Sequence, residues 1–198
     1  QGTGADTASG KALAFLRERD VSPIAIQGIL TSVQVKDHEA DGRVTPYLKV
    51  GMKDGNDRFY LSVDLGQAGA QMLARKLANA EAGVETTLKL FATWQQRPGA
   101  SRPYADHGAT LKQSGKEVPG VDPQTALVPA VNSALEALKV AAPDIDEKTL
   151  SNRRAKVTLD YHRGLLEAVN DRFATFYATR GTTTPEAEAE PASAQAAA

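Results

Sequence analysis

Apolar and polar residues alternate strictly in the stretch 47–65, on both sides of an Asp54-Gly55 pair. Successive side chains of a β-strand point to opposite faces, and an Asp-Gly pair between two alternating runs is typical of a two-residue hairpin turn. With this pair in the turn, Val50 lies opposite Phe59. The pattern therefore predicts a β-hairpin with one apolar face, formed by Leu48, Val50, Met52, Phe59, Leu61, Val63 and Leu65.

The other face of this hairpin is aromatic and basic, with Tyr47, Lys49, Arg58 and Tyr60 on two neighbouring strands. Bases stack on aromatic rings while cations follow the phosphates, so this combination is typical of a surface that binds single-stranded nucleic acid. The alternative is an ordinary solvated strand surface, because Tyr favours strands and Lys and Arg commonly cover exposed ones.

The segment before the hairpin predicts a further strand in which the phase of the alternation changes. Ile24 and Ile26 share one parity, whereas Ile29, Thr31, Val33 and Val35 share the other, with Gly28 at the change. This indicates either a loosely patterned strand or a glycine bulge that bends one strand across two sheets. The polar segment 37–43 is predicted as a loop that leads into the hairpin.

Beyond the hairpin the spacing of apolar residues changes to that of a helix over 67–80. Strands are predicted at 85–95 and 104–112, and the segment 96–103 between them, with two Pro, one Gly and two Arg, is predicted as a loop. Gly and Pro residues between 115 and 120 close the unit. The predicted order is three strands, one helix and two strands over 24–120.

This order resembles the OB-fold of single-stranded-DNA-binding proteins, a five-stranded barrel that removes its strand edges by closure. The resemblance rests on the order of elements, the phase change at Gly28 and the aromatic hairpin face. It implies an α+β, mainly β protein whose five-stranded OB-type barrel, with a helix between strands 3 and 4, is followed by a C-terminal helical extension.

In that family the ligand crosses strands two and three and lies between the loops that join strands one to two and four to five. Trp94 shares the parity of Leu88 and Leu90, so burial in the core is an alternative to base stacking for this residue. Two arginines in a surface loop are likewise ordinary. The resemblance implies a nucleic-acid-binding set of Tyr47, Lys49, Arg58, Tyr60, Trp94, Arg97, Arg102 and Tyr104.

Helical spacing dominates 121–180. Asp122 and Pro123 are predicted to begin a helix that Pro143 ends, and Asp144 or Asp146 is predicted to cap a second helix that continues to Arg180. The apolar stripe of the second helix makes 146–180 a predicted surface for forming homo-oligomers. The segment 1–23 is predicted to hold a short helix, and the Pro, Ala and Glu-rich segment 181–198 is predicted as a disordered acidic tail.

Charge limits the interpretation as a nucleic-acid binder, because the net charge of the 198-residue chain is −1. Segment 24–120 holds 12 Lys and Arg against 10 Asp and Glu, segment 121–180 is balanced, and the tail adds three Glu. Four charged or polar residues between Asn152 and Lys156 form a basic cluster, for which a solvated helical face is the favoured interpretation. The body of the protein is therefore only mildly basic.

Signals of catalysis are weak. There are no cysteines, and the three histidines show no metal-ligand spacing. Asp106 and His107 are adjacent strand residues, which point to opposite faces and so do not form an acid and base pair. We expect no enzymatic activity, no cofactor and no metal.

The function expected from the sequence is binding and protection of single-stranded DNA in replication or recombination, with DNA favoured over RNA. Two alternatives remain: a protein-interaction or assembly module whose helical extension oligomerises or docks a partner, and a barrel that binds an oligosaccharide or another ligand. No run approaches the roughly 18 apolar residues of a membrane span. We expect a cytoplasmic protein without membrane contact, although Gln1 is also consistent with a cleaved tag or signal peptide.

Overall fold

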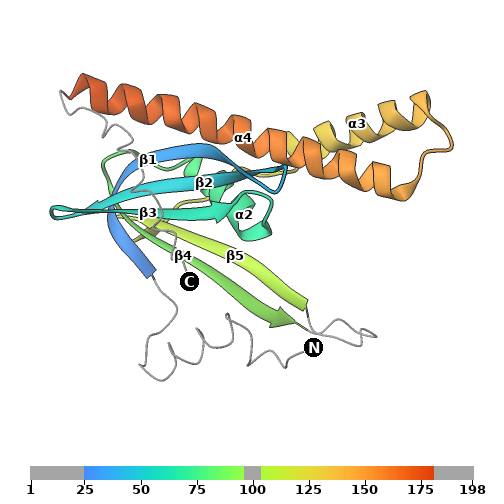
Figure 1. Cartoon of the computed structure of the whole chain (residues 1–198). Helices are drawn as coiled ribbons and strands as arrows, with labels where there is room; N and C mark the ends of the chain where they lie inside the picture. The colour runs from blue at the N-terminus through green and yellow to red at the C-terminus, as the bar shows by residue number, and fades with distance from the viewer. Residues whose placement is uncertain (1–24, 96–103, 181–198) are drawn as a thin grey trace, which may run out of the picture.

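The computed structural model describes residues 25–95 and 104–180, with the side chains of 92–95 and 104–106 left undescribed. The described residues form one antiparallel sheet and helices on one side of it (Figure 1). In chain order the elements are β1 Ala25–Ala40, β2 Arg43–Asp54, β3 Asp57–Asp64, α2 Ala68–Leu77, β4 Glu85–Gln95, β5 Tyr104–Gln113, β6 Lys116–Glu117, α3 Leu127–Ala141 and α4 Glu147–Thr179.

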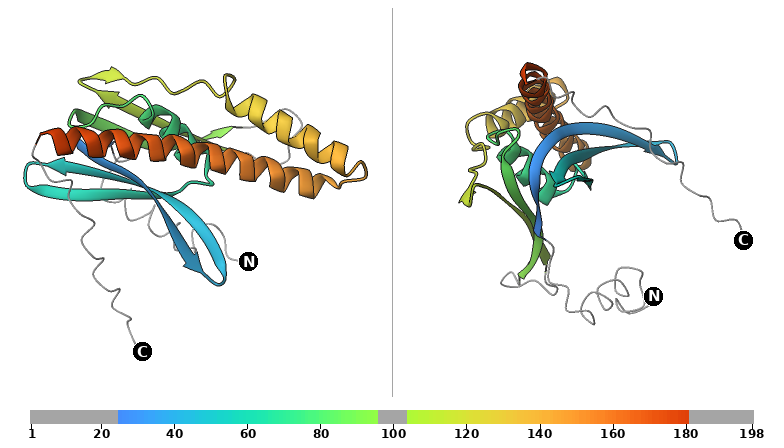
Figure 2. Two further views of the ribbon diagram at one scale, coloured as in Figure 1. Left: turned by 90° about the horizontal axis from the view of Figure 1, so that it is seen from above. Right: turned by 90° about the vertical axis from the view of Figure 1, so that its left-hand side faces the viewer.

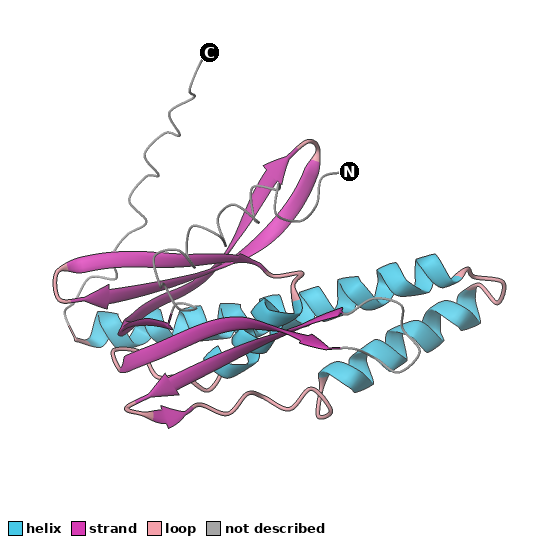
Figure 3. Ribbon diagram, turned by 90° about the horizontal axis from the view of Figure 1, so that it is seen from below, coloured by secondary structure: helices cyan, strands magenta, loops and turns pink. Residues whose placement is uncertain are grey.

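The sheet has six strands in the order β3-β2-β1-β4-β5-β6 and it is open, so the predicted closed five-stranded barrel is wrong (Figure 3). Closure requires the two edges of a sheet to pair. Here β3 pairs only with β2 in the described sheet, while β5 pairs with β4 and with the two-residue β6. The α+β class, the helix after the third strand and the C-terminal helices are confirmed.

β1 passes from one partner strand to another and contains a bulge, but within one sheet rather than across two as the bulge interpretation predicted. Ala25–Ile29 pairs with β4 and Ile29–Ala40 pairs with β2, so Ile29 has both partners, and the register shifts between Leu30 and Ser32. The bulge therefore lies three residues beyond Gly28, whose backbone instead approaches the carbonyl of Lys53. The extra residue lets β1 bend, and the strand runs as an arch in the right-hand view of Figure 2.

The hairpin of β2 and β3 forms as predicted, but its register differs by two residues. The turn holds Gly55 and Asn56, so Met52 rather than Val50 lies opposite Phe59. A shift by two leaves every side chain on its original face, so the alternating pattern does not distinguish the two registers. Gly55 takes the positive φ of 55° at the first turn position.

The predicted polar loop at 37–43 is wrong, because β1 and β2 continue toward each other and form a second hairpin. Its turn is only Asp41 and Gly42, which have φ of 52° and 69°. Positive φ at both positions is the requirement of a type I′ turn, which Asp-Gly meets. The sequence signal that identified the first hairpin is thus present here too, among residues too polar to suggest strands.

Helices α2 and α4 cover one face of the sheet and complete the core (Figure 2). The buried apolar residues of β1, β2, β4 and β5 pack against the inner sides of these helices. α3 begins four residues later than predicted, because Asp122 forms a turn with Gln124 and Thr125. The buried helical residues in this core are Leu73, Ala74, Leu77, Leu166, Val169 and Phe173.

α4 is attached to the rest of the protein by polar contacts as well. The guanidinium of Arg172 donates to the carbonyls of Leu77, Ala78 and Ala80, at and just beyond the end of α2. The hydroxyl of Tyr177 donates to the Leu30 carbonyl over 2.9 Å. Asp146 caps α4 by accepting from the Thr149 N–H, as one of the two predicted caps. An oligomer formed through 146–180 stays a prediction.

Acid is expected to loosen the contact of α2 with α4. His162 is buried on α4 and its Nδ1 donates to the Thr158 carbonyl, while burial and the nearby Arg75 cation of α2 lower the pKa of the imidazole below 6.5. The unfolded chain therefore binds a proton before the folded one does. The free energy of unfolding should be constant above pH 6.5 and fall as the pH decreases below it.

Urea unfolding at several pH values from 5 to 8 measures this effect. The variant His162→Gln should show a flatter dependence over the same range. The carboxyl groups with lowered pKa, such as Asp37 and Glu117, titrate at lower pH. They therefore do not account for a change in the free energy of unfolding near pH 6.5. An equally steep decrease in the variant would contradict the assignment to His162.

Candidate nucleic-acid interface

The strand pairing sorts the side chains of the sheet into two faces. Residues opposite each other in neighbouring strands point to the same side, so the registers allow one face to be followed across all of β1 to β5. One face packs against α2 and α4. The other face, here called the open face, carries Gln27, Ile29, Ser32, Gln34, Lys36, Arg43, Tyr47, Lys49, Lys53, Arg58, Tyr60, Ser62, Asp64, Glu85, Thr87, Lys89, Phe91, Thr110 and Lys112.

Charge is divided unequally between these faces. Among the described side chains of β1 to β5, the core face holds no Lys or Arg and four acidic residues: Asp37, Glu39, Asp54 and Asp57. The open face holds two acidic residues, Asp64 and Glu85, against seven basic ones: Lys36, Arg43, Lys49, Lys53, Arg58, Lys89 and Lys112. A chain with a net charge near zero thus presents a basic surface.

Tyr60 lies on the open face with 56% of its surface exposed. Its position opposite Gly51 explains how the ring lies against the sheet, because a Cβ on Gly51 would come within 3.0 Å of the Tyr60 Cε1 and would collide with the Ser32 hydroxyl. A glycine opposite an aromatic residue has no side chain, so the ring can lie flat against the backbone of the neighbouring strand. The outer face of the Tyr60 ring is available to solvent.

Phe91 repeats this arrangement on the other half of the sheet. It lies opposite Gly108 of β5, and a Cβ on Gly108 would collide with the Phe91 ring. Phe91 is 45% exposed, which is unusual for an aromatic residue without a polar atom. Phe91 is not among the residues predicted to bind nucleic acid, because its signal is the glycine opposite, which only the β4–β5 register reveals.

A hollow of about 460 Å³ lies beside Phe91 on the open face. Two lysines and two threonines stand around it, so the ring is bordered by cations and hydroxyl groups. Its lining consists of Thr87, Lys89, Leu90, Phe91, Thr110 and Lys112.

Of the eight residues predicted to bind nucleic acid, the structure brings four together. Tyr47, Lys49, Arg58 and Tyr60 share the open face of β2 and β3, although Tyr47 is half-buried, with its ring edge-on to His38 at 6.1 Å between centroids. The backbones of Trp94 and Tyr104 lie in β4 and β5, but their side chains are outside the described structure. Arg97 and Arg102 lie outside the described residues.

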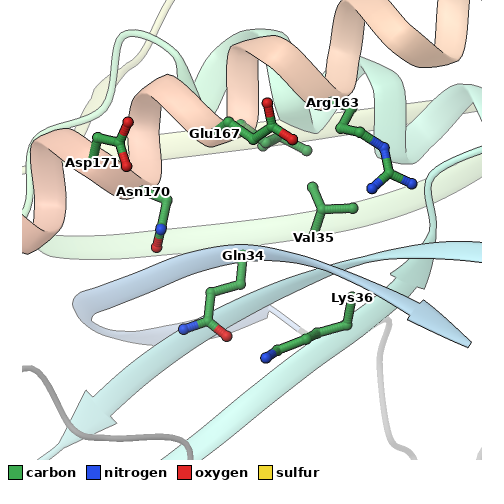
Figure 4. Close-up of a pocket in the computed structure, with 8 residues that line it drawn as sticks. Gln34, Val35, Lys36, Arg163, Glu167, Asn170 and Asp171 are labelled. Atoms are coloured by element: carbon green, nitrogen blue, oxygen red, sulfur yellow. The ribbon is translucent and has the colours of Figure 1, made fainter.

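A second hollow, of about 290 Å³, lies between β1 and α4 (Figure 4). Val35 points toward α4, whereas Gln34 and Lys36 point away from it onto the open face (Figure 4). Arg163 at its rim forms an ion pair with Asp37, with 2.6 Å between Nη2 of Arg163 and Oδ1 of Asp37. The polar groups here do not converge on one point, so this hollow is a weaker candidate than the open face.

Comparison with known proteins found no matching family model, no similar curated protein and no similar solved structure. Within residues 25–95 and 104–180, no cluster of three or more His, Cys, Asp or Glu side chains is arranged to hold a metal ion. None of the helices in this part of the chain has the length and apolar character needed to cross a membrane.

Proposed function

We propose that the open face binds single-stranded nucleic acid, DNA in preference to RNA, and protects it during replication or recombination. The observation that carries this proposal is the pair of exposed rings, Tyr60 and Phe91, each seated over a glycine within a basic surface. Flat exposed rings bind bases of any sequence, and the surrounding cations contact phosphates. Paired bases do not offer their faces to such rings, so the surface favours single strands.

The distance between the rings suits a strand of several nucleotides. Ser32 of β1 pairs with Gly51, which pairs with Tyr60, so Ser32 gives the position of Tyr60 along β1. Ala25 of β1 pairs with Lys89, which is two residues before Phe91 in β4. The path along the strands is thus about nine residues, or roughly 30 Å at 3.3 Å per residue. Single-strand sites on OB-folds cover about 4–16 nucleotides, which is the range that such a path requires.

The resemblance to an OB-fold is part of the same proposal. The helix follows the third strand, and strands one to five form a continuous antiparallel sheet in which β1 bends between two partners. An OB barrel requires one further pairing, of β3 with β5, which the sheet of residues 25–95 and 104–117 does not contain. The surface on strands two and three is the one that binds ligands in OB-folds, and it coincides with half of the open face.

Salt dependence of binding tests the role of the lysines around Phe91. The affinity for a labelled oligothymidine of about 20 nucleotides is measured by fluorescence polarisation at several salt concentrations. Each phosphate contact contributes about 0.7 to the slope of log affinity against log salt, so Lys89→Ala with Lys112→Ala should make the slope shallower by about 1.4.

A matched control removes two exposed cations of α4, Lys148 and Arg153, which are not on the sheet. This control should leave the slope unchanged. The proposal fails if the unaltered protein does not bind the oligothymidine at low salt, or if both double variants change the slope equally.

A further inference from the structure

β3 is an edge strand whose outer backbone groups can be identified. The Leu65 N–H donates to the Pro46 carbonyl across the hairpin, 2.9 Å away. Hydrogen-bonded positions alternate along an antiparallel pair, so the odd-numbered residues of β3 bond to β2. The even-numbered residues Arg58, Tyr60 and Ser62 therefore present their N–H and C=O groups to the free edge. Asp64 presents its N–H there, while its C=O accepts from the Gln67 N–H over 3.0 Å.

An exposed row of unpaired backbone groups is a template for another strand. β3 is eight residues long and contains no proline, and its edge position leaves Phe59, Leu61 and Val63 only half-buried on the core side. These features together favour pairing with a strand that brings its own apolar row.

We propose that a second copy of this chain pairs with β3, antiparallel and with a twofold axis at Leu61. In this register Arg58 lies opposite Asp64 of the second copy, so opposite charges meet at both ends. Phe59 lies opposite Val63, and Leu61 lies opposite itself. The β3 sequence is thus self-complementary on both faces, as an interface with twofold symmetry requires.

The hydrogen-bonding pattern allows this register. Tyr60 lies opposite Ser62 of the second copy, and both present their backbone groups outward. Asp64 accepts from the Gly66 N–H over 2.7 Å, and its second oxygen has only a long contact, 3.4 Å, with Gln67, which leaves it able to accept from Arg58 of the second copy. Opposed side chains share a face, so the open faces of the two copies form one continuous surface.

Cysteine cross-linking tests both the dimer and its register, because the chain has no cysteine of its own. At Leu61 the two copies face each other in a non-hydrogen-bonded pair, with Cα atoms about 4.5 Å apart, within the range of a disulfide. Leu61→Cys should therefore form a covalent dimer on mild oxidation. Val63→Cys, on the same face, lies four positions from its counterpart, roughly 13 Å, and should not.

Ser62→Pro tests the backbone pairing. It removes an outward N–H that β2 does not use, and proline is tolerated on an edge strand in this orientation. Light scattering at tens of micromolar, without nucleic acid, should show dimers for the unaltered chain and for Ser62→Ala. Ser62→Pro should be monomeric, and circular dichroism should show that it remains folded.

The results separate the dimer from nucleic-acid binding, because no nucleic acid is present in these measurements. A monomeric unaltered chain overturns the proposal, as does a Ser62→Pro variant that remains dimeric. Cross-linking of Tyr60→Cys or Ser62→Cys in place of Leu61→Cys overturns the register. Cross-linking at Leu61 together with loss of the dimer in Ser62→Pro supports it.

Discussion

Replacing Tyr60 and Phe91 together by alanine is expected to weaken binding to oligothymidine at least about 30-fold. Each stacked base contributes about 1 to 3 kcal/mol when its ring is truncated, and tenfold in affinity corresponds to about 1.4 kcal/mol. The two rings lie on different halves of the sheet, so their contributions should add. Fluorescence polarisation of the single and double variants measures the effect.

Conservative and remote variants make this test specific. Tyr60→Phe keeps the ring and should retain most of the affinity, whereas a role for the hydroxyl would make it as weak as Tyr60→Ala. Val140→Ala removes an apolar side chain that is 81% exposed on α3 and should change nothing. Unchanged affinity in the double alanine variant, with folding intact, would refute stacking on these rings.

Truncating Phe173 to alanine is expected to lower the free energy of unfolding by about 3 to 5 kcal/mol. The ring is 2% exposed and packs in the core that α4 shares with the sheet and α2. Loss of a buried phenylalanine removes its transfer free energy and leaves a cavity. A domain of this kind is stable by about 5 to 15 kcal/mol in total, so the loss is a large fraction.

Urea unfolding followed by circular dichroism measures this loss, with the exposed Ala174→Ser on the same helix as the control. The control should change the free energy of unfolding by less than about 0.5 kcal/mol. A loss below about 1 kcal/mol in Phe173→Ala would mean that α4 is a separable extension. The division of the chain at residue 120, predicted from the Gly and Pro residues and the helical spacing beyond them, would then describe independent folding units.

The candidate site was only partly predictable from the sequence. Tyr47, Lys49, Arg58 and Tyr60 were assigned to one face by alternation alone, and they do share it. Phe91 is in the same position with respect to Gly108 as Tyr60 is to Gly51, but each glycine is far from its ring in sequence. Only strand pairing brings them together, and no local pattern contains that information.

The charge of the site was likewise predictable only in part from the sequence. Composition indicated a nearly neutral protein, which argued against nucleic-acid binding. Alternation along each strand places acidic and basic residues on opposite sides of that strand. The basic residues form one continuous surface only because the five strands pair with their equivalent sides facing the same way. Asp37 illustrates the consequence, since it faces away from the basic surface and binds Arg163 of α4.

The sequence by itself determined most of the strands and helices and the face on which their side chains lie, because these follow from local periodicity and turn residues. It missed the hairpin at 37–43, where no apolar alternation marks the strands. The tertiary structure alone decided whether the sheet closes. A strand has no local signal for its second neighbour, and here Leu166 and Phe173 of α4 cover the apolar face that a closed barrel would enclose. Because α4 covers this apolar face, the β3 edge of the described sheet remains unpaired. The open face of the sheet remains exposed for the same reason.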